Sequence, residues 1–326
     1  MTVDKTVYCT VISRSYLRRA AAFYASLRRF HPDAEFHALV VDVRKTDDIP
    51  ERAYLPFTIV SIDEVPVHAI EVMRLYYDAM ELICALKPSL IRHLLVDGGA
   101  RKVIYVDADA FVAGRFDVAE DLLDRYDLLL TPHTTKPLPL DGKLPDDLEI
   151  ADYGVYNGGF WGVRNSPRAL EIMNWLIARL RVKGFAWPER HMFCDQKLLP
   201  LAAQFAGDGF HALTHPGYNL AYWNLHERDL VCEDGRFLAN GEPAVFFHLS
   251  GYDEKAPEVF TKHTDRFTVE NRPVLREVLA HYRGLLAEAP AAEATDYGYA
   301  VHNGVRLTPA MRRHFFVQNN FERRLA

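Results

Sequence analysis

The sequence predicts an α/β fold with a parallel sheet, and three observations support this prediction. An apolar run at 7–12, a helix-forming segment at 16–30 and a second apolar run at 35–42 follow one another. This strand–helix–strand order is the usual start of a parallel sheet. A further short run, Val103 to Val106, is β-branched and aromatic, as expected of a buried strand. Hydrophobic residues make up 49% of the 326 residues and charged residues 25%, so the chain can bury a large core.

The first helix is predicted from its apolar spacing and from the residues at its ends. Its apolar positions recur at helical intervals, at Leu17, Ala20, Ala21, Tyr24 and Leu27. Pro32 ends it, and Ser13 or Ser15 is suited to be its N-cap. Thr10 and Ser13 also lie near the carboxyl end of the first strand, where open α/β sheets bind ligands. Both are candidate contacts of a nucleotide, with a helix cap as the alternative for Ser13.

The middle of the chain continues the alternation of strands and helices. A short strand is expected at 57–62, followed by a helix at 71–96 that is interrupted at Lys87–Pro88, because proline disrupts a helix. A helix and then a strand are expected within 116–131. Residues 132–152 contain four prolines and many polar residues, which predicts a loop that moves over a ligand.

The strand predicted at 155–164 contains two adjacent glycines, Gly158 and Gly159. Glycine weakens a strand unless something approaches the backbone closely. A sugar ring against the backbone and a bulge packed on a neighbouring strand are both compatible with this pattern. Helices are predicted next, at 167–182 and 188–205.

Two carboxylates, Asp107 and Asp109, follow the central strand directly. Carboxylates with this spacing can converge on one ion where a strand leaves the sheet and turns. Oxygen ligands suit a hard cation such as Mg²⁺ or Mn²⁺, and an ion that also binds a substrate diphosphate activates the leaving group. The alternative for an isolated Asp-x-Asp is a helix cap or a solvated turn.

Charge and cysteine usage exclude several classes of protein. The net charge of −6 does not suggest a nucleic-acid partner. The four cysteines are scattered without a CxxC pair, so neither a zinc site nor a disulfide framework is predicted, and a reducing cytoplasm is expected. The N-terminal apolar run is too short and polar for a signal peptide, and no window is apolar enough for a transmembrane helix. Peripheral contact with the inner face of a membrane stays open.

Four segments together resemble one family. They are Val106–Asp109, Tyr156–Phe160, Cys194–Gln196, and Phe247–Gly251 with Lys255. In order and spacing they resemble GT-A fold glycosyltransferases related to glycogenin and the bacterial lipopolysaccharide galactosyltransferases, over roughly residues 5–255. The resemblance implies a Rossmann-like mixed sheet flanked by helices in a domain at 1–255, with a mainly helical extension at 256–326. It also implies a retaining, metal-dependent transfer of a sugar from a nucleotide sugar, expected to be a UDP-sugar.

The resemblance also implies the metal ligands. Asp107, Asp109 and His248 match the family residues that bind Mn²⁺, with Mg²⁺ as the other candidate. Carboxylate and imidazole together suit Mn²⁺ better than Mg²⁺. Without the family, a histidine at the end of an apolar strand would be interpreted as a core residue.

Two lysines match the cations that hold the donor diphosphate. Lys87 lies about where the family has an arginine, although a lysine is not a bidentate arginine and a solvated helix end is the alternative. Lys255 matches a family lysine with one extra residue in the Gly251–Lys255 spacing. That extra residue separates the chain from the family pattern, and Asp253 would then form a hydrogen bond within the loop.

The remaining matches concern the sugar. Asn157, Gly158 and Gly159 match a family segment that contacts the donor sugar or the acceptor. Asp195 is assigned to a donor-sugar hydroxyl, and Gln196 is placed near the anomeric carbon without a nucleophilic role, since a neutral amide acts only electrostatically.

Two other functions compete with sugar transfer. One is a GT-A domain that binds a nucleotide sugar without turnover. The other is a phosphatase of the haloacid dehalogenase type, which also places Asp-x-Asp after an apolar strand but normally near the N-terminus. The acceptor stays open between a glycan, a lipid-linked sugar, a protein and a small molecule.

Aromatic residues allow two interpretations at two places. Tyr218, Tyr222 and Trp223 either stack on sugar faces or belong to the core. The tail beyond the short linker Ala287–Ala294 is basic and aromatic. It either docks on a membrane or a second chain, or packs back on the domain. Its basic and aromatic residues are Arg312, Arg313, Phe315, Phe316, Phe321, Arg323 and Arg324.

Overall fold

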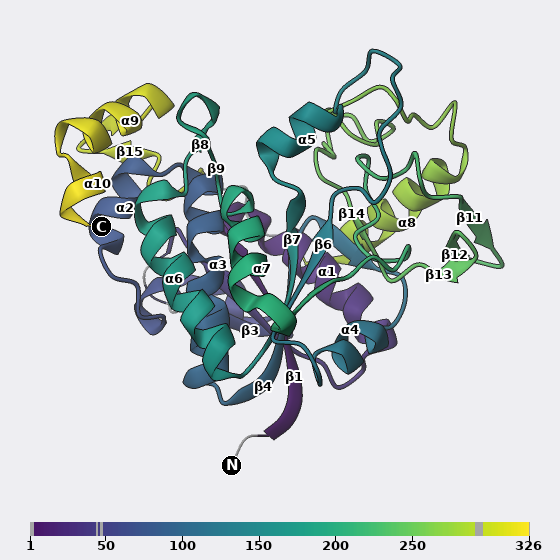
Figure 1. The fold of residues 1–326 in the computed structure, drawn as a ribbon, viewed down its shortest axis with the longest axis horizontal. Coiled ribbons are helices and arrows are strands. Elements are labelled where there is room, and N and C mark those ends of the chain that lie inside the picture. Colours follow the sequence, from purple (N-terminus) through teal and green to yellow (C-terminus); the bar gives the residue numbers. More distant parts are fainter. Residues whose placement is uncertain (1–2, 44, 46–47, 291–295, 326) are drawn as a thin grey trace.

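The computed structural model describes residues 3–43, 45, 48–290 and 296–325 (Figure 1). A seven-stranded mixed sheet in the order β10-β6-β7-β4-β1-β2-β3 forms its centre. The strands are β1 (Val3–Ile12), β2 (Glu35–Val40), β3 (Thr58–Ser61), β4 (Ala100–Val106), β6 (Leu128–Pro132), β7 (Tyr156–Arg164) and β10 (Phe210–Ala212). β1 pairs in parallel with β2 and β4, whereas β7 is antiparallel to β4 and β6. The expected mixed sheet is confirmed.

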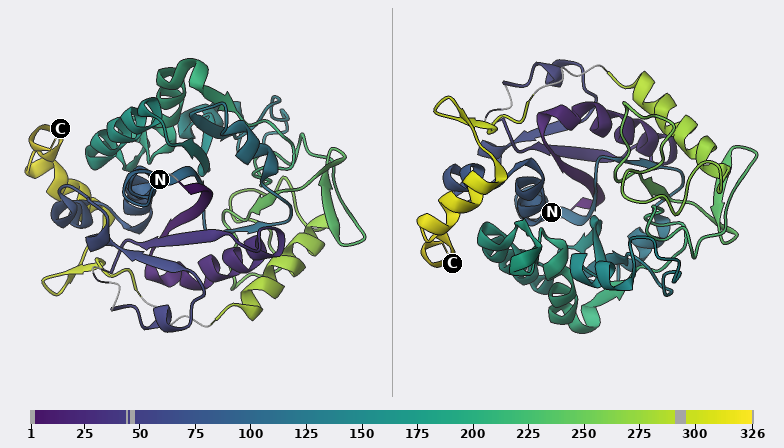
Figure 2. Two further views of the ribbon diagram at one scale, coloured as in Figure 1. Left: turned by 90° about the horizontal axis from the view of Figure 1, so that it is seen from below. Right: turned by 90° about the horizontal axis from the view of Figure 1, so that it is seen from above.

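Helices cover both faces of this sheet (Figure 2). α3, α6 and α7 share one hydrophobic core with one face, and α1 and α4 share a second core with the other. Their bounds are α1 (Leu17–Phe30), α3 (Ala79–Val96), α4 (Asp117–Leu122), α6 (Pro167–Lys183) and α7 (Leu199–Ala206). Burial of these apolar faces is the main source of stability for such a three-layer arrangement.

A short antiparallel pair beside the main sheet brings distant segments together. β5 (Ala110–Val112) pairs with β14 (Phe246–His248), so that His248 lies opposite Ala110. The pairing joins the turn that follows β4 to a strand more than a hundred residues later in the chain. Three smaller sheets complete the fold: β8 (Ala186–Trp187) with β9 (Met192–Phe193), β15 (Val301–His302) with β16 (Val305–Arg306), and β11 (Leu230–Glu233), β12 (Arg236–Ala239) and β13 (Glu242–Pro243).

The helix predicted at 71–96 breaks at a different place from the one expected. α2 (Ile70–Tyr76) ends before Asp78, whereas α3 continues through Pro88. Asp78 starts α3 with a reciprocal cap, because its carboxylate accepts the N–H of Glu81 and the Glu81 carboxylate accepts the N–H of Asp78. The proline costs one backbone hydrogen bond, and packing of α3 on β1, β4 and α6 offsets it.

The stretch 132–152 is not entirely a loop. α5 (Asp147–Tyr153) forms at its end, with the Asp146 carboxylate accepting the N–H of Glu149 as an N-cap. Arg266, which is buried, donates to the Asp141 carboxylate and to the carbonyls of Lys143 and Pro145. These bonds tie the stretch to a distant segment of the chain.

The helix predicted at 188–205 begins only at Leu199. Before it come a 3₁₀ turn, the strand β9 and a second 3₁₀ turn at Gln196–Leu198. His191 and Cys194 have φ values of 57° and 48°, in the left-handed region, which a right-handed helix does not contain. Asp195 and Gln196 consequently lie in a turn.

The C-terminal extension is mainly helical and packs on the rest of the chain. α8 (Val274–Glu288) shares a core with Phe111 and Phe247. α9 (Pro309–Gln318) and α10 (Phe321–Arg324) bury Phe316 and Phe321 against the core that contains α3. Of the predicted linker, 291–294 lies outside the described residues, and the domain boundary at 255 stays a prediction. No helix in the described part of the chain is long and apolar enough to cross a membrane.

Candidate active site

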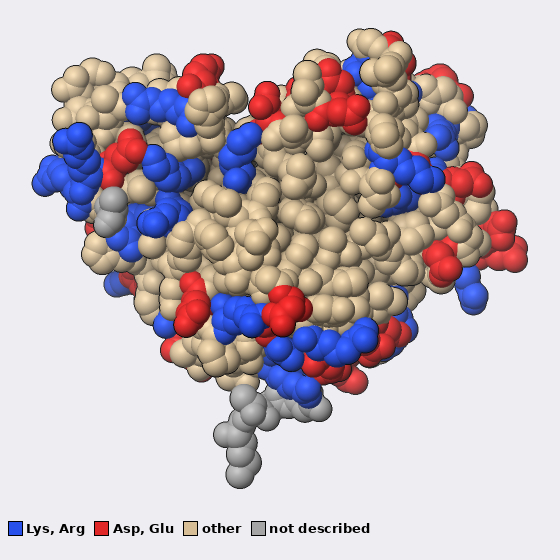
Figure 3. Space-filling model, in the orientation of Figure 1, with Lys and Arg blue, Asp and Glu red and all other residues tan. Residues whose placement is uncertain are grey.

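A cleft of about 500 Å³ opens at the carboxyl ends of β1 and β4. Its walls come from the first turn of α1, from α3, from α5 and the turn after β9, and from the segment that follows β14. In the space-filling view, a notch at the top of the molecule separates the lobe that carries the tail from the lobe that carries α5 (Figure 3). Open α/β sheets bind ligands at this edge.

Asp107, Asp109 and His248 converge in this cleft, and one ligand atom from each lies within 4.8 Å of the others. His248 Nε2 is 3.2 Å from Asp109 Oδ1 and 4.0 Å from Asp107 Oδ2. The β5–β14 pair sets this arrangement, and the N–H of Leu249 also donates to the Asp109 carbonyl. Burial raises the pKa of Asp109, but His248 and Arg19 lower it to about 2, so this carboxylate is ionised.

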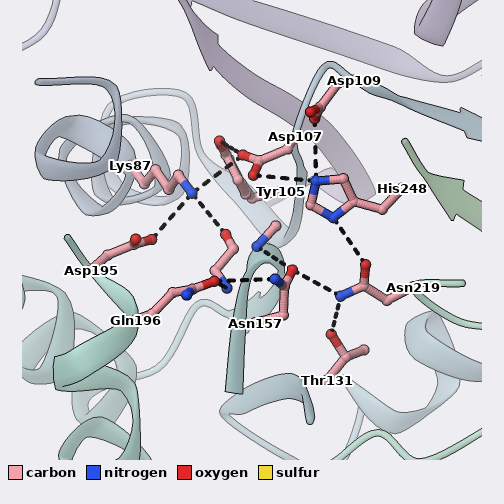
Figure 4. Close-up of polar contacts among 12 residues, drawn as sticks. Lys87, Tyr105, Asp107, Asp109, Thr131, Asn157, Asp195, Gln196, Asn219 and His248 are labelled. Atoms are coloured by element: carbon pink, nitrogen blue, oxygen red, sulfur yellow. Dashed lines mark hydrogen bonds and ion pairs between the residues drawn. The ribbon is translucent and has the colours of Figure 1, made fainter. Parts of the chain in front are cut away.

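A chain of amide hydrogen bonds orients the imidazole of His248 (Figure 4). The N–H of Gly159 donates to Asn157 Oδ1, which also accepts from Asn219 Nδ2. Asn219 therefore presents its Oδ1 to His248 Nδ1, at 3.1 Å. Nδ1 is the donor in this pair, so Nε2 is left to face the two carboxylates. A carbonyl oxygen behind a histidine is the usual support of a metal-binding imidazole.

Lys87 is buried between two carboxylates and is not a solvated helix end. Its Nζ is 3.3 Å from Asp107 Oδ1 and 3.2 Å from Asp195 Oδ2, and it donates to the Gly158 carbonyl at 2.9 Å. Burial lowers the pKa of Lys87, but Asp107 and Asp195 raise it well above the usual range. Tyr105 also donates a hydrogen bond to Asp107. The positive charge of Lys87 thus offsets the negative charge of the carboxylates at the floor of the cleft.

The two glycines of β7 make room for site side chains. A Cβ at Gly158 would lie 2.8 Å from Asp195 Oδ2, and a Cβ at Gly159 would lie 2.4 Å from His248 Cε1. In the structure, the groups that approach this backbone closely are therefore a carboxylate and an imidazole. Contact of this backbone with a sugar ring, considered from the sequence, stays a prediction.

Asp195 and Gln196 both line the cleft from the turn after β9. Gln196 Oε1 accepts from the N–H of Gly158 at 2.9 Å and from Asn157 Nδ2 at 3.1 Å, and Nε2 donates to the Tyr153 carbonyl at 3.3 Å. The amide is therefore fixed in one orientation. Asp195 is paired with Lys87 and is 1% exposed, which holds its carboxylate at the cleft wall.

Five predicted residues are not among those that line the cleft: Gly158 and Gly159 in β7, and Thr10, Ser13 and Lys255. Thr10 is buried in β1, and its Oγ1 has no hydrogen-bond partner among the described residues. Ser13 caps no helix through its side chain, and its Oγ lies 2.9 Å from Ser15 Oγ. Lys255 is exposed, and its N–H donates to Asp253 Oδ1, as expected for a bond within that loop. The structure therefore does not bring Lys255 to the cleft.

Sequence reasoning missed two cations that do line the cleft, Arg19 and Lys262. Arg19 Nη2 donates to the Tyr252 carbonyl at 3.2 Å, and its guanidinium lies 4.8 Å from the centre of the Tyr16 ring. The sequence contains a signal that could have predicted Arg19, because this residue lies one helical turn after Tyr16 in the segment that follows β1. It contains no such signal for Lys262, because the path of a long irregular segment brings that residue to the cleft.

The aromatic residues divide between the two interpretations. Tyr222 and Trp223 line the cleft, whereas Tyr218 is buried against Phe116, Phe160 and Phe246. Trp223 also packs edge-on to His248, with ring centres 5.2 Å apart. Tyr222 is therefore available to a ligand, whereas Trp223, at 3% exposed, belongs to the core as Tyr218 does.

Comparison with known proteins gives the fold a name. The galactosyltransferase LgtC, solved with donor and acceptor sugar analogues, matches 89% of this chain and 98% of its own with a TM-score of 0.52 and 13% identity. The bifunctional glycosyltransferase WbbM matches 89% of this chain and 51% of its own, with a TM-score of 0.51 and 13% identity. The chain has the GT-A fold.

Relatives in sequence are more similar but are themselves uncharacterized. YfnF of Bacillus subtilis (strain 168) is 25% identical over 261 residues, which cover 76% of this chain and 82% of YfnF. YfnD of the same organism is 23% identical over 255 residues, covering 75% of this chain and 77% of YfnD. No protein-family model matches the chain.

Proposed function

We propose that this protein is a metal-dependent glycosyltransferase that moves a sugar from a UDP-sugar to an acceptor hydroxyl. The convergence of Asp107, Asp109 and the Nε2 face of His248 in a cleft of a GT-A fold carries the proposal. Two carboxylates and one imidazole form a donor set that suits Mn²⁺, with Mg²⁺ as the second candidate. When bound, such an ion would take up the negative charge that develops on the leaving nucleotide.

The diphosphate of the donor requires cations that are not already paired. Lys87 is occupied by Asp107 and Asp195, so its part is to hold those carboxylates and to lower the negative charge of the cleft floor. Arg19 and Lys262 also line the cleft, Arg19 half-buried and Lys262 exposed. We assign the phosphate contacts to these two side chains, and Lys262 replaces Lys255 in that role.

The donor sugar is assigned to the wall formed by β7 and the turn after β9. Asn157, Gly158 and Gly159 shape this wall, and Asp195 is the hydroxyl-binding carboxylate. Gln196 is fixed beside it and presents a dipole near the anomeric carbon. Among the described residues that line the cleft, Asp195 is the one carboxylate outside the metal set, and Lys87 holds it. Lys87 thus keeps this carboxylate from acting as a general base for inversion, and transfer with retention stays part of the proposal.

The competing functions have less support. In a phosphatase of the haloacid dehalogenase type, the first aspartate must be free to attack phosphorus. Here Lys87 and Tyr105 both bind Asp107, and the fold is GT-A. A binding domain without turnover has the same site and is separated from an enzyme only by activity.

Calorimetric titration of the protein with UDP, with and without Mn²⁺, tests the proposal. Asp109→Ala is the test variant, and Asp208→Ala is its control because the Asp208 side chain is 91% exposed. We expect UDP binding that requires Mn²⁺, is lost in Asp109→Ala and persists in Asp208→Ala. Metal-independent binding, or equal binding by both variants, would contradict the metal site.

Hydrolysis of UDP-sugars separates an enzyme from a binding domain. Release of UDP that depends on Mn²⁺ and disappears in Asp109→Ala would support turnover. The anomer released, followed by NMR, reports on retention. Tight UDP binding with no hydrolysis and no transfer to any acceptor would favour the non-catalytic alternative.

A further inference from the structure

Two cysteines, Cys84 and Cys194, meet on the wall of the cleft. Both residues line it, and both are free thiols. Cys84 is partly exposed on α3, whereas Cys194 is 4% exposed and directly follows β9. The two thiols are hydrogen-bonded to each other, although they are more than a hundred residues apart in the chain. The proposed function uses neither of them.

Contacts on either side of the thiol pair fix its position. Glu81 accepts an N–H from β8 at 3.0 Å, and Lys87 Nζ is 3.2 Å from Asp195 Oδ2. Cys84 lies one helical turn after Glu81 and one turn before Lys87, so these three residues share one face of α3. Cys194 is the residue before Asp195. The packing of α3 against β8 and the turn after β9 therefore places the two thiols opposite each other.

Cys194 begins a turn that is strained and that is connected to the site. Its φ of 48° is in the left-handed region, which a residue with a Cβ rarely adopts. The next residues are Asp195, which pairs with Lys87, and Gln196, which accepts the N–H of Gly158. In contrast, α3 is an 18-residue helix packed on β1, β4 and α6. A bond that draws Cys194 towards α3 should therefore move the turn, and Gln196 with it.

The pair is suited to remain reduced until it meets an oxidant. The hydrogen bond with Cys194 and burial raise the pKa of the Cys84 thiol well above its ordinary value. Cys84 is therefore protonated at neutral pH and reacts slowly, because the thiolate is the nucleophile in thiol chemistry. The cleft, of about 500 Å³, gives a small reagent access to both residues. A disulfide, with an S–S length of about 2.0 Å, then requires the thiols to approach each other more closely.

We infer that Cys84 and Cys194 form a reversible disulfide, which switches off sugar transfer by displacing the turn that carries Gln196. The co-reactant is a small-molecule disulfide. One cysteine attacks a sulfur of the reagent and releases a first thiol, and the other cysteine then attacks the resulting mixed disulfide and releases a second thiol. Two protons and two electrons pass from the cysteines to the reagent. The bond itself does not depend on the proposed function, whereas its effect on turnover rests on it.

Oxidation with cystamine, a small disulfide, tests the site by mass spectrometry. We expect the protein to lose two hydrogen atoms, and peptide mapping to link the segment with Cys84 to the segment with Cys194. Dithiothreitol should reverse the change, and Cys84→Ser and Cys194→Ser should not form the link. Cys232→Ser is the matched control and should still form it. Like Cys84, Cys232 is a partly exposed free thiol, but it lies in β11 and does not line the cleft.

The effect on the site is measured on the same oxidised protein. Hydrolysis of a UDP-sugar should fall about tenfold or more, since a displacement of about 1 Å can cost about 10²-fold. Binding of UDP with Mn²⁺ should persist, because the three proposed metal ligands lie on other elements. Hydrogen exchange at the N–H of Gly158 should become faster, because its acceptor is Gln196. Cys84→Ser should keep its turnover in cystamine.

Three results would exclude this switch. They are mixed disulfides that persist without an intramolecular link, a linked protein whose hydrolysis and exchange at Gly158 equal those of the reduced protein, and equal inactivation of Cys84→Ser by cystamine. Failure of the proposed function has a different signature, because the reduced protein would then hydrolyse no UDP-sugar. Peptide mapping and hydrogen exchange would still decide whether the disulfide forms and moves the turn.

Discussion

Lys87, whose side chain is 3% exposed, places a positive charge between Asp107 and Asp195. Without Lys87, the two carboxylates would repel one another, and the buried carboxylate of Asp195 would lose its hydration with no opposite charge to compensate for it. The lysine offsets this repulsion and pairs with the buried carboxylate of Asp195. The charge balance of the cleft is therefore set by a residue that need not touch the substrate.

Lys87→Met tests this role. It removes the charge at similar volume, so we expect the free energy of unfolding to fall by about 3–5 kcal/mol, as for other buried pairs that lose one partner. Chemical denaturation measures the change. Lys87→Met combined with Asp195→Asn should recover part of the loss, and a double variant as unstable as the sum of the single variants would contradict the pairing.

His133 predicts how stability depends on pH. Burial lowers the pKa of His133 from 6.5 to about 4. Between these values the unfolded chain binds a proton that the folded chain does not, so stability is present above pH 6.5 and is lost as the pH falls towards 4. This imidazole should contribute a slope of about 1.4 kcal/mol per pH unit. Denaturation of His133→Gln across this window should show a correspondingly shallower slope, and equal slopes would contradict the assignment.

At the scale of elements, β7 and β14 have to lie close enough for His248 to reach Asp109. Gly159 allows this approach, because any Cβ there would meet the imidazole at 2.4 Å. Gly159→Ala should displace His248 and weaken Mn²⁺-dependent UDP binding by about tenfold or more, measured by calorimetry.

Gly284→Ala is the matched control for Gly159→Ala. A Cβ at Gly284, inside α8, would meet nothing within 4 Å. Alanine there should leave nucleotide binding unchanged and raise the free energy of unfolding by about 0.5–1 kcal/mol. Weakened binding in both variants would show that the effect does not come from contact with His248.

Elements were predicted best where local signals agree with packing. Strands β1, β2, β4 and β7 and helix α1 lie close to their expected bounds, because apolar periodicity decides them. α5 was missed although Asp146 and Glu149 form an N-terminal signal, since the prolines before it dominated the interpretation. α3 continues through Pro88 because its burial against the sheet outweighs one lost hydrogen bond.

At the scale of the whole molecule, the tail and the rest of the chain are one packed unit. The basic and aromatic end was interpreted from the sequence either as a docking segment or as one that packs back. Phe316 and Phe321 are buried against Tyr76, and Arg312 is 3% exposed, so packing back is confirmed. Arg313 also donates to the Ala186 carbonyl.

Arg312→Met should release this end of the chain. Four carbonyl groups would lose their donor, which should lower the free energy of unfolding by about 3 kcal/mol and make the tail sensitive to limited proteolysis. Arg306→Met is the control, because this side chain is 66% exposed and its pair with Asp296 is worth about 0.5 kcal/mol or less. Equal protease resistance of both variants would argue against Arg312 as the anchor.

The sequence by itself determined the α/β class, the central strand with Asp107 and Asp109 at its end, and the segments that supply His248, Asn157 and Gln196. These features are local, because hydrophobic periodicity and short motifs depend on near neighbours along the chain. Only the tertiary structure decided which charged groups meet. It buried Lys87, excluded Lys255, brought Arg19 and Lys262 to the cleft and packed the tail beside it. Those outcomes depend on long-range packing and on irregular segments, whose path no local pattern specifies.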